Sequence, residues 1–328
     1  MRTTRTAQAT VMALAAVALG ACGSTQHASA SHTHETASVA YAGSLEYLNE
    51  HVIGPDFARA TGDVYEGRGG GSFGLAHDII AGEISPNVFE SIGGAPIAEL
   101  EPRFTRWYVT VASSPIVLAY NPHTSFAPRL AAIAAGRAPF TELFSLLRTP
   151  GFLLGRTNPA TDPQGQAFYE MVELATVRYH LPASTTSAVL GSLENPSQVY
   201  SETSLEARLE SGQLDAASAF RSQAIQLHLP YIALPAAIDF GDPADAATYA
   251  TASLTLPDGS VVHGHALTLA VTTLGRHDQG AAMAFVDYVI DGAGREALAA
   301  GGYTLLRPTV TGTGVPHVVR TAVARADG

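Results

Sequence analysis

Three short turns in this sequence combine residue types that can hold a small anion. In the longest, Gly155–Gly165, Asp162 stands directly before Pro163. This pair is typical of a helix start, because the carboxylate accepts the free amides of the first turn and Pro suits the first helical position. A helix start also presents unpaired N–H groups and the positive end of the helix dipole, which suit an anion. The turns Gly43-Ser44 and Gly71-Ser72 have the same design.

Each of these turns is expected to follow a strand and to open a helix. The expected strands are Val39–Tyr41, Asp63–Glu66 and Gly151–Gly155. After the third strand, the apolar residues Phe168, Met171, Val172, Leu174 and Ala175 recur at helical spacing. Ligands of open α/β sheets collect at the carboxyl ends of strands, next to helix starts. We therefore expect Ser44, Ser72 and the segment Thr157–Gly165 to line one cleft, although both serines, and Asp162, can equally act as plain helix caps.

The alternation of strands and helices occurs twice along the chain and predicts an α/β protein with two lobes. Two extended apolar runs, Pro115–Tyr120 and Ala266–Thr272, are candidate crossings between the lobes. We expect a mostly parallel sheet from the first strand–helix repeats. The predicted division is lobe 1 at residues 39–115 plus 269–309, lobe 2 at 116–268, and a loosely ordered tail at 310–328. Within lobe 1, one long helix is expected from Gly280 to Ala299.

Composition limits the classes of partner. The chain has 328 residues, 46% of them hydrophobic, and a net charge of -11 at pH 7. The hydrophobic content is enough for two domains with sizeable cores. The negative charge argues against nucleic acid and against an anionic membrane surface as partners. It does not argue against a small anion, which a local ring of amides can bind.

The N-terminus predicts export. Arg2 and Arg5 precede an apolar run, Val11–Leu19, that is too short to span a bilayer as a stable anchor. The run ends at Cys22, the single cysteine of the chain. This arrangement resembles a bacterial lipobox, so that residues 1–21 form a lipoprotein signal peptide and Cys22 carries the lipid outside the cytoplasmic membrane. The alternative is an ordinary signal peptide with a chance cysteine. Residues 22–38, rich in small polar residues, are expected to form a tether.

A series of short motifs, taken in order, resembles the periplasmic molybdate/tungstate-binding proteins of ABC importers, in particular their archaeal-type branch. The resemblance implies a two-lobed periplasmic-binding-protein fold of type II, in which each lobe is a mixed sheet flanked by helices. It also implies a monomeric receptor without cofactor or enzymatic activity, which closes on an oxyanion and delivers it to a membrane permease. The motifs are Ala42-Gly43-Ser44-Leu45, Gly71-Ser72, Trp107-Tyr108, Val117-Leu118-Ala119-Tyr120, Asn158-Pro159, Asp162-Pro163-Gln164-Gly165, Gly212-Gln213-Leu214-Asp215, Arg221-Ser222-Gln223-Ala224 and Gly301-Gly302-Tyr303.

The resemblance also implies a ligand set, with one departure. In the archaeal-type branch a Glu and an Asp add to the tetrahedral oxyanion and raise the metal's coordination to six. Asp162 matches the Asp, but the Glu position falls at Ala219, so we expect no second carboxylate and doubt six-fold coordination. The role of Arg221 is left open. It can bind the anion directly, offset the anion's charge without touching it, or form an ion pair at the surface or between the lobes. The implied ligand-binding residues are Ser44, Ser72, Thr157, Asp162, Gln164, Gly165 and Arg221.

Other functions are weaker on the same sequence. The absent Glu favours a receptor of the same fold for sulfate, phosphate or an organic anion. Ser72, His77 and Asp78 are residue types that hydrolases use, but Ser72 lacks the Gly-x-Ser-x-Gly turn of a nucleophile elbow. His263 and His265 alone do not make a four-ligand zinc site.

Overall fold

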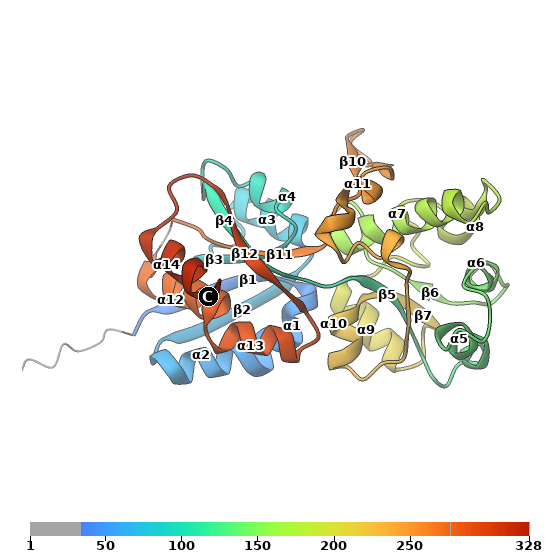
Figure 1. Ribbon diagram of the computed structural model, residues 1–328, viewed down its shortest axis with the longest axis horizontal. Coiled ribbons are helices and arrows are strands. Elements are labelled where there is room, and N and C mark those ends of the chain that lie inside the picture. The colour runs from blue at the N-terminus through green and yellow to red at the C-terminus, as the bar shows by residue number, and fades with distance from the viewer. Residues whose placement is uncertain (1–33, 276, 328) are drawn as a thin grey trace, which may run out of the picture. The chain divides into compact units, whose positions relative to one another are not determined.

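Two lobes, each with its own sheet, make up the part of the chain that the structure describes. The computed structural model describes residues 34–275 and 277–327. The predicted signal peptide, Cys22 and most of the predicted tether lie outside the described residues. In Figure 1 the chain starts in the lobe with the larger sheet, passes to the second lobe and returns.

Lobe 1 contains a six-stranded sheet with the order β12-β4-β11-β3-β1-β2. Strand β1 pairs in parallel with β2 and β3, whereas β11 pairs antiparallel with β3 and β4, and β12 antiparallel with β4. The expectation of a mostly parallel sheet is therefore wrong, because β4, next to the crossing into lobe 2, and the returning β12 both run antiparallel to their neighbours. The strands are β1 (Thr36–Ala42), β2 (Val64–Gly70), β3 (Val88–Ile92), β4 (Trp107–Ser113), β11 (Thr268–Thr273) and β12 (Thr304–Gly312).

The helices of lobe 1 flank this sheet (Figure 1). After β1 the chain runs through a short 3-10 turn, a helical turn and a π-helical segment before a regular α-helix. The helical elements are η1 (Gly43–Leu45), α1 (Glu46–Leu48), η2 (Asn49–Ile53), α2 (Gly54–Thr61), α3 (Ser72–Ala81), α4 (Ala95–Ala98), α12 (Gln279–Asp291), α13 (Ala293–Ala300) and α14 (His317–Ala326).

Lobe 2 contains a four-stranded sheet with the order β6-β7-β5-β8. Strand β5 pairs antiparallel with β7 and β8, and β6 pairs in parallel with β7. Strands β9 and β10 form a separate antiparallel pair. The elements are β5 (Ile116–Tyr120), α5 (Ala127–Ala134), α6 (Glu142–Leu146), β6 (Leu154–Gly155), α7 (Pro163–Arg178), α8 (Thr185–Leu190), α9 (Glu202–Glu210), β7 (Ala216–Phe220), α10 (Arg221–Gln226), β8 (Tyr231–Ala233), η3 (Ala236–Ile238), η4 (Pro243–Asp245), α11 (Ala246–Tyr249), β9 (Ser253–Thr255) and β10 (Val261–His263).

Three expectations about the chain's course are wrong. The single helix expected from Gly280 to Ala299 is two helices, α12 and α13, because Gly292 between them leaves the helical conformation at ψ -162. The tail expected to be loose forms the end of β12 and then α14, which packs on α12 through the buried side chain of Val319. The predicted tether ends too late, because β1 already begins at Thr36 and pairs with β2 there.

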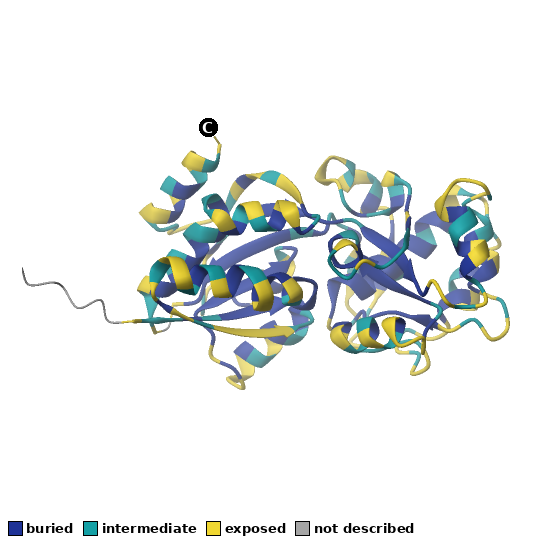
Figure 2. Cartoon of the chain, turned by 90° about the horizontal axis from the view of Figure 1, so that it is seen from below, coloured by how far each residue is buried: buried dark blue, intermediate teal, exposed yellow. Residues whose placement is uncertain are grey.

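Burial follows the two sheets. In Figure 2 most strands of the two larger sheets are dark blue, whereas the residues of the two edge strands of the lobe 1 sheet, β2 and β12, are mainly exposed. Helix α12 packs its Phe285 ring edge-on against Phe57 of α2, with 5.3 Å between ring centroids. The strands on either side of residues 114–115 and 264–267 belong to different sheets. We propose that these two segments are the crossings between the lobes.

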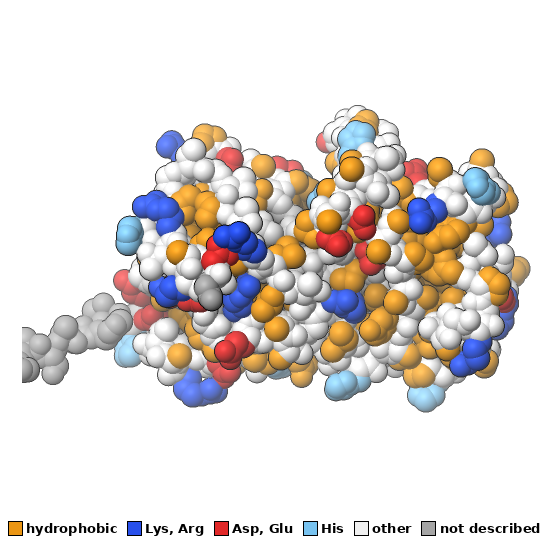
Figure 3. Space-filling model, in the orientation of Figure 1, with side chains coloured by type: hydrophobic (Ala, Val, Ile, Leu, Met, Phe, Trp, Pro, Cys, Tyr) orange, Lys and Arg blue, Asp and Glu red, His pale blue; other side chains and the backbone are white. Residues whose placement is uncertain are grey.

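Helix hydropathy and the charges on one face of the molecule bear on possible membrane and nucleic-acid contacts. None of the helices in the described ranges has the length and hydropathy needed to cross a bilayer. The face in Figure 3 carries separate basic and acidic groups and no continuous basic area.

Candidate functional site

A pocket of about 530 Å³ lies between the two lobes. Lobe 1 contributes the glycines at the end of β1 and around the end of β2, and lobe 2 contributes the loop before α7 and the start of α9. Among the lining residues there is no Arg and no Lys. We call this the interlobe pocket, and its lining residues are Gly43, Gly69, Gly70, Gly71, Thr157, Asn158, Thr161, Asp162, Val199, Tyr200, Ser201, Glu202 and Thr203.

The glycines of lobe 1 allow the lobes to approach closely. The N–H of Gly74 donates to the carbonyl oxygen of Thr161 in lobe 2 at 3.2 Å. A Cβ atom on Gly71 would lie 2.5 Å from that same oxygen, and one on Gly43 would overlap the carboxylate of Glu202. Real Cβ atoms do not approach so closely, so any larger residue at either position would hold the lobes apart. The two Gly-Ser turns predicted as cleft loops thus do meet lobe 2.

Neither Ser44 nor Ser72 is a helix cap. Ser44 lies inside η1, and its hydroxyl is buried with no hydrogen-bond partner among the described residues. Ser72 is the first residue of α3 after the cap position at Gly71, and its hydroxyl oxygen accepts the N–H of Ile92 at 3.1 Å. The capping alternative is therefore wrong for both serines. Ser44 retains a free donor next to the interlobe pocket, whereas Ser72 ties α3 to the end of β3.

Asp162 caps α7 as its sequence predicts. The carboxylate oxygen Oδ1 accepts the N–H of Gln164 at 2.8 Å. Burial raises the pKa of Asp162 to about 6, although the N–H groups of Gln164 and Gly165 and the nearby Thr157 hydroxyl oppose this. The Thr157 hydroxyl is buried and makes no hydrogen bond of normal geometry within the described chain. Capping uses one Asp162 oxygen, and the residue still lines the pocket.

A second carboxylate lies beside Asp162, and sequence reasoning missed it. Glu202 is the first residue of α9, it is buried, and it lines the interlobe pocket. The expectation that the site lacks a second carboxylate is therefore wrong. The second carboxylate comes from Glu202 and not from position 219, where the chain has Ala. A bridge between Arg156 and Val199 lays the segment before α9 against the loop before α7, and so brings Glu202 to Asp162. The signal was present in the sequence: the side chain of Ser201 caps α9, accepting the N–H of Ser204.

Burial and neighbouring carboxylates raise the pKa values of the acidic side chains at the pocket. Burial raises the pKa of Glu202 well above its usual range, and the nearby carboxylates of Asp162 and Glu206 raise it further. The pKa of Glu206 is raised to about 8 by burial and by Glu46 and Glu210. Burial therefore disfavours the charged forms of these carboxyl groups unless a positive centre binds them.

Gln164 and Gly165 support this arrangement from the first turn of α7. The Gln164 side chain is fully buried and donates to Glu202 Oε1 at 3.1 Å. At Gly165 a Cβ atom would lie 2.6 Å from the carbonyl oxygen of Thr157, so glycine lets α7 pack against its own preceding loop. Neither residue is among those that line the pocket.

Arg221, whose role the sequence left open, lies away from the pocket lining, and so does the buried Arg156. Arg221 donates to the Gly302 carbonyl oxygen at 3.3 Å and to Thr304 Oγ1 at 2.8 Å, which links α10 to lobe 1. Arg156 is fully buried and donates to the carbonyl oxygens of Ser192 and Leu193. Arg156 thus holds the loop after α8 in place.

The three residues considered for a hydrolase do not form a catalytic group. His77 Nε2 pairs with Glu99 at 3.0 Å, and Asp78 with Arg68 at 3.7 Å. The Ser72 oxygen accepts the backbone N–H of Ile92. Ser72, His77 and Asp78 therefore each bind a different partner and do not bind one another.

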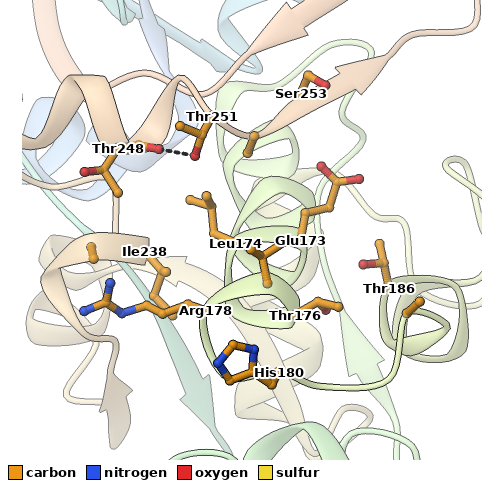
Figure 4. Close-up of a pocket in the computed structure, with 14 residues that line it drawn as sticks. Glu173, Leu174, Thr176, Arg178, His180, Thr186, Ile238, Thr248, Thr251 and Ser253 are labelled. Carbon is orange, nitrogen blue, oxygen red and sulfur yellow. Dashed lines mark hydrogen bonds between the residues drawn. The ribbon is translucent and has the colours of Figure 1, made fainter.

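A larger pocket, of about 750 Å³, lies wholly within lobe 2 and contains none of the predicted site residues. It is formed by the end of α7, by α8 and by the segment from η3 to β9. In Figure 4 the side chains of Glu173, Arg178 and His180 point in different directions and do not converge on one point. The smaller interlobe pocket, where carboxyl and hydroxyl groups converge, is therefore the candidate site.

Comparison with known proteins identifies the family. Residues 37–304 match the family described as bacterial extracellular solute-binding protein. The chain belongs to this family. It is accordingly a solute-binding protein of the ABC transporter type, as the resemblance implied.

Individual relatives agree with this assignment. This solute-binding protein is 33% identical over 270 residues to a Haloferax volcanii protein provisionally named an ABC transporter molybdenum-binding protein, with 82% of each chain covered. It is 24% identical over 239 residues to the molybdate/tungstate-binding protein of Pyrococcus abyssi, covering 67% of this chain and 68% of the relative. The periplasmic molybdate-binding protein of Azotobacter vinelandii matches in structure with a TM-score of 0.54 at 16% identity, over 83% of this chain and all of the other. This match shows the type II periplasmic-binding-protein fold.

Proposed function

We propose that this solute-binding protein is the extracytoplasmic receptor of an ABC importer and captures molybdate or tungstate in the interlobe pocket. It acts as a binding protein and not as an enzyme. The observation that carries the proposal is the pairing of Asp162 with Glu202 beside the buried, unpartnered hydroxyls of Ser44 and Thr157. The names of two relatives support the same ligand class.

The donors of the pocket suit an anion whose centre is a metal. The hydroxyl and N–H groups of both lobes can donate to the oxygen atoms of a tetrahedral oxyanion, and the pocket lining offers no fixed cation. Two carboxylates facing a plain dianion would repel it. They attract an oxyanion when they ligate its metal centre, and Glu202, although it does not stand at the Glu position of the archaeal-type pattern, supplies a second carboxylate. We therefore propose that Asp162 and Glu202 both bind the metal of the bound oxyanion.

Calorimetric titration of the mature protein with molybdate, tungstate and sulfate tests the proposal. We expect micromolar or tighter binding of molybdate or tungstate and much weaker binding of sulfate. The variants Asp162→Ala and Glu202→Gln should each lose about 10- to 100-fold in affinity, as is usual when a metal ligand or its support is removed. Gln at position 202 can still accept from Gln164, so the loss would report the carboxylate itself. Full affinity in both variants would mean a hydrogen-bonded tetrahedral anion without carboxylate ligation.

The size of the pocket favours a second candidate ligand. Its volume of about 530 Å³ falls in the range of sites for organic ligands, roughly 300–1,000 Å³. An organic anion, or another oxyanion such as phosphate, would then be the solute. Binding of neither molybdate nor tungstate, together with a thermal shift in a screen of organic anions, would favour this alternative.

Anchoring at the membrane belongs to the same proposal. Cys22 would carry the lipid and hold the receptor, as a monomer, on the outer face of the membrane near its permease. A Cys22→Ser variant should leave the membrane fraction and appear in the medium or periplasm. Release of the wild-type protein to the same extent would contradict lipid anchoring.

A further inference from the structure

Two buried amide side chains in lobe 2 are both directed at the same oxygen of Glu202. Gln164 Nε2 donates to Glu202 Oε1 at 3.1 Å, and Gln223 Nε2 donates to the same atom at 3.0 Å. Gln164 comes from the first turn of α7 and Gln223 from the first turn of α10. Both side chains are almost completely buried. Glu202 therefore receives support from two helices other than its own.

The orientation of both amides is fixed by their other partners. The backbone N–H of Phe220, which can only donate, points at Gln223 Oε1 at 2.8 Å. The Nε2 atom of Gln223 must therefore face the carboxyl groups of Glu202 and Glu206, the latter at 2.6 Å. Gln164 Nε2 also donates to Gln223 Oε1 at 3.2 Å.

Ser218 completes this series of hydrogen bonds. Its hydroxyl donates to Gln164 Oε1 at 2.8 Å and so occupies the remaining acceptor of that amide. The amides of Gln164 and Gln223 cannot flip without losing hydrogen bonds in a buried environment, which is costly.

This arrangement leaves the second oxygen of Glu202 for a ligand. Within the described residues Glu202 Oε2 makes no hydrogen bond, and it lies toward Gly43 of lobe 1, where a Cβ atom would overlap it. We propose that Gln223, together with Gln164, is a positioning residue that locks the Glu202 carboxyl group with Oε2 facing the interlobe pocket. This inference rests on the proposed function, in which Glu202 binds the captured oxyanion.

The test is a double-mutant cycle with Gln223→Met, which keeps the side-chain length and removes the hydrogen bonds. Tungstate and molybdate are titrated by calorimetry into wild type, Gln223→Met, Glu202→Ala and the double variant. We expect Gln223→Met to lower affinity about 10-fold in the wild-type background and to change it less than 2-fold in the Glu202→Ala background. Equal losses in both backgrounds would overturn the proposal, because Gln223 would then act on the fold and not through Glu202.

Gln226→Met is the matched control. Gln226 lies on the same helix and its amide donates to the Gly301 carbonyl oxygen at 2.8 Å, without contact to Glu202. Any loss it causes should be the same in both backgrounds. A coupling to Glu202 as large as that of Gln223 would contradict a specific positioning role.

A ligand-free crystal structure of Gln223→Met supplies a readout that does not depend on binding. We expect the Glu202 side chain to leave its present rotamer or to occupy several. A single unchanged rotamer would overturn the proposal. If the wild-type protein binds neither oxyanion, the proposed function fails, and this crystallographic result alone decides the role of Gln223.

Discussion

Glu90 of lobe 1 and Glu202 of lobe 2 are both buried carboxyl groups, and their surroundings differ. Glu90 lies inside the six-stranded sheet, where Oε2 accepts from Asn49 Nδ2 at 2.6 Å and Oε1 has no partner among the described residues. Glu202 has two amide donors on Oε1 and a pocket in front of Oε2. The two buried carboxyl groups thus differ in what surrounds them: Glu90 is enclosed by the fold, and Glu202 faces the interlobe pocket.

The largest effect that would test this contrast is on stability. Burial raises the pKa of Glu90 to about 7. Because the folded state holds this proton more tightly than the unfolded chain, stability should fall as pH rises from about 4.5 to 7 and then level off. Glu90→Gln removes this titration and should stabilise the protein by about 3 kcal/mol at pH 8, with little change at pH 4. Chemical denaturation at both pH values measures it.

The same Glu90→Gln variant should bind the solute as wild type does. Glu90 has no contact with the interlobe pocket. A change in affinity of more than a few fold would break the contrast between the two carboxyl groups.

The next effect concerns how lobe 1 closes over Glu202 and its neighbours. Gly71→Ala places a Cβ atom against the Thr161 carbonyl oxygen, a backbone atom that cannot move aside cheaply. We expect about a 100-fold loss of solute affinity, since overpacking of this kind costs about 1–3 kcal/mol. Unfolding stability should be unchanged, and small-angle scattering should show a more open protein with ligand.

Gly74→Ala is the control for this substitution. Its Cβ atom would meet only the Thr161 Cβ, at an ordinary 3.8 Å. It should retain full affinity and gain up to about 1 kcal/mol in stability as a helical Gly→Ala change. Equal losses in both variants would mean that α3, and not lobe closure, limits binding.

A smaller effect is expected at the buried hydroxyl of lobe 1. Ser44→Ala removes a donor that has no partner in the described protein, so it should weaken solute binding about 10-fold without reducing stability. Ser113, also buried with an unpartnered hydroxyl but outside the pocket lining, is the matched control. Calorimetry should find Ser113→Ala unchanged. A loss in stability for Ser44→Ala would assign its hydroxyl to the fold.

The smallest effect is expected at the rim of the pocket. Thr203 Oγ1 donates to Glu46 Oε2 across the lobes at 2.8 Å, in an exposed position. Thr203→Val keeps the shape and removes this bond, and exposed polar contacts contribute little, about 0.5 kcal/mol. A two- to threefold faster solute release in stopped-flow measurements is expected. No change in release rate would exclude this contact from the closed state.

Much of the fold could be predicted from sequence because its signals are local. The Asp162–Pro163 start of α7 is confirmed, since the residues of a helix cap are close together in sequence. The break at Gly292 and the ordered α14 were missed. The periodic pattern near residues 280–300 continues across Gly292, and the apolar residues of α14 are only Val and Ala, without the Leu, Ile, Met or aromatic side chains that mark a packed helix most clearly.

The candidate site could be predicted only in part. Asp162 and Thr157 were found because they stand at a recognisable strand–helix turn. Glu202 was missed because the three predicted strand–helix turns do not include the start of α9, where Ser201 is the cap. Arg221 is on the expected helix, but its guanidinium group bonds to Gly302 and Thr304, which no local pattern indicates.

The sequence by itself determined the strand–helix turns and the family, since these depend on residue order and on backbone preferences over a few positions. Only the tertiary structure decided which side chains meet. Asp162 and Glu202 are distant in sequence and become neighbours through the bridge between Arg156 and Val199. Such a meeting depends on strand pairing between remote segments, and the pairing is set by burial of the whole lobe and not by the residues that it brings together.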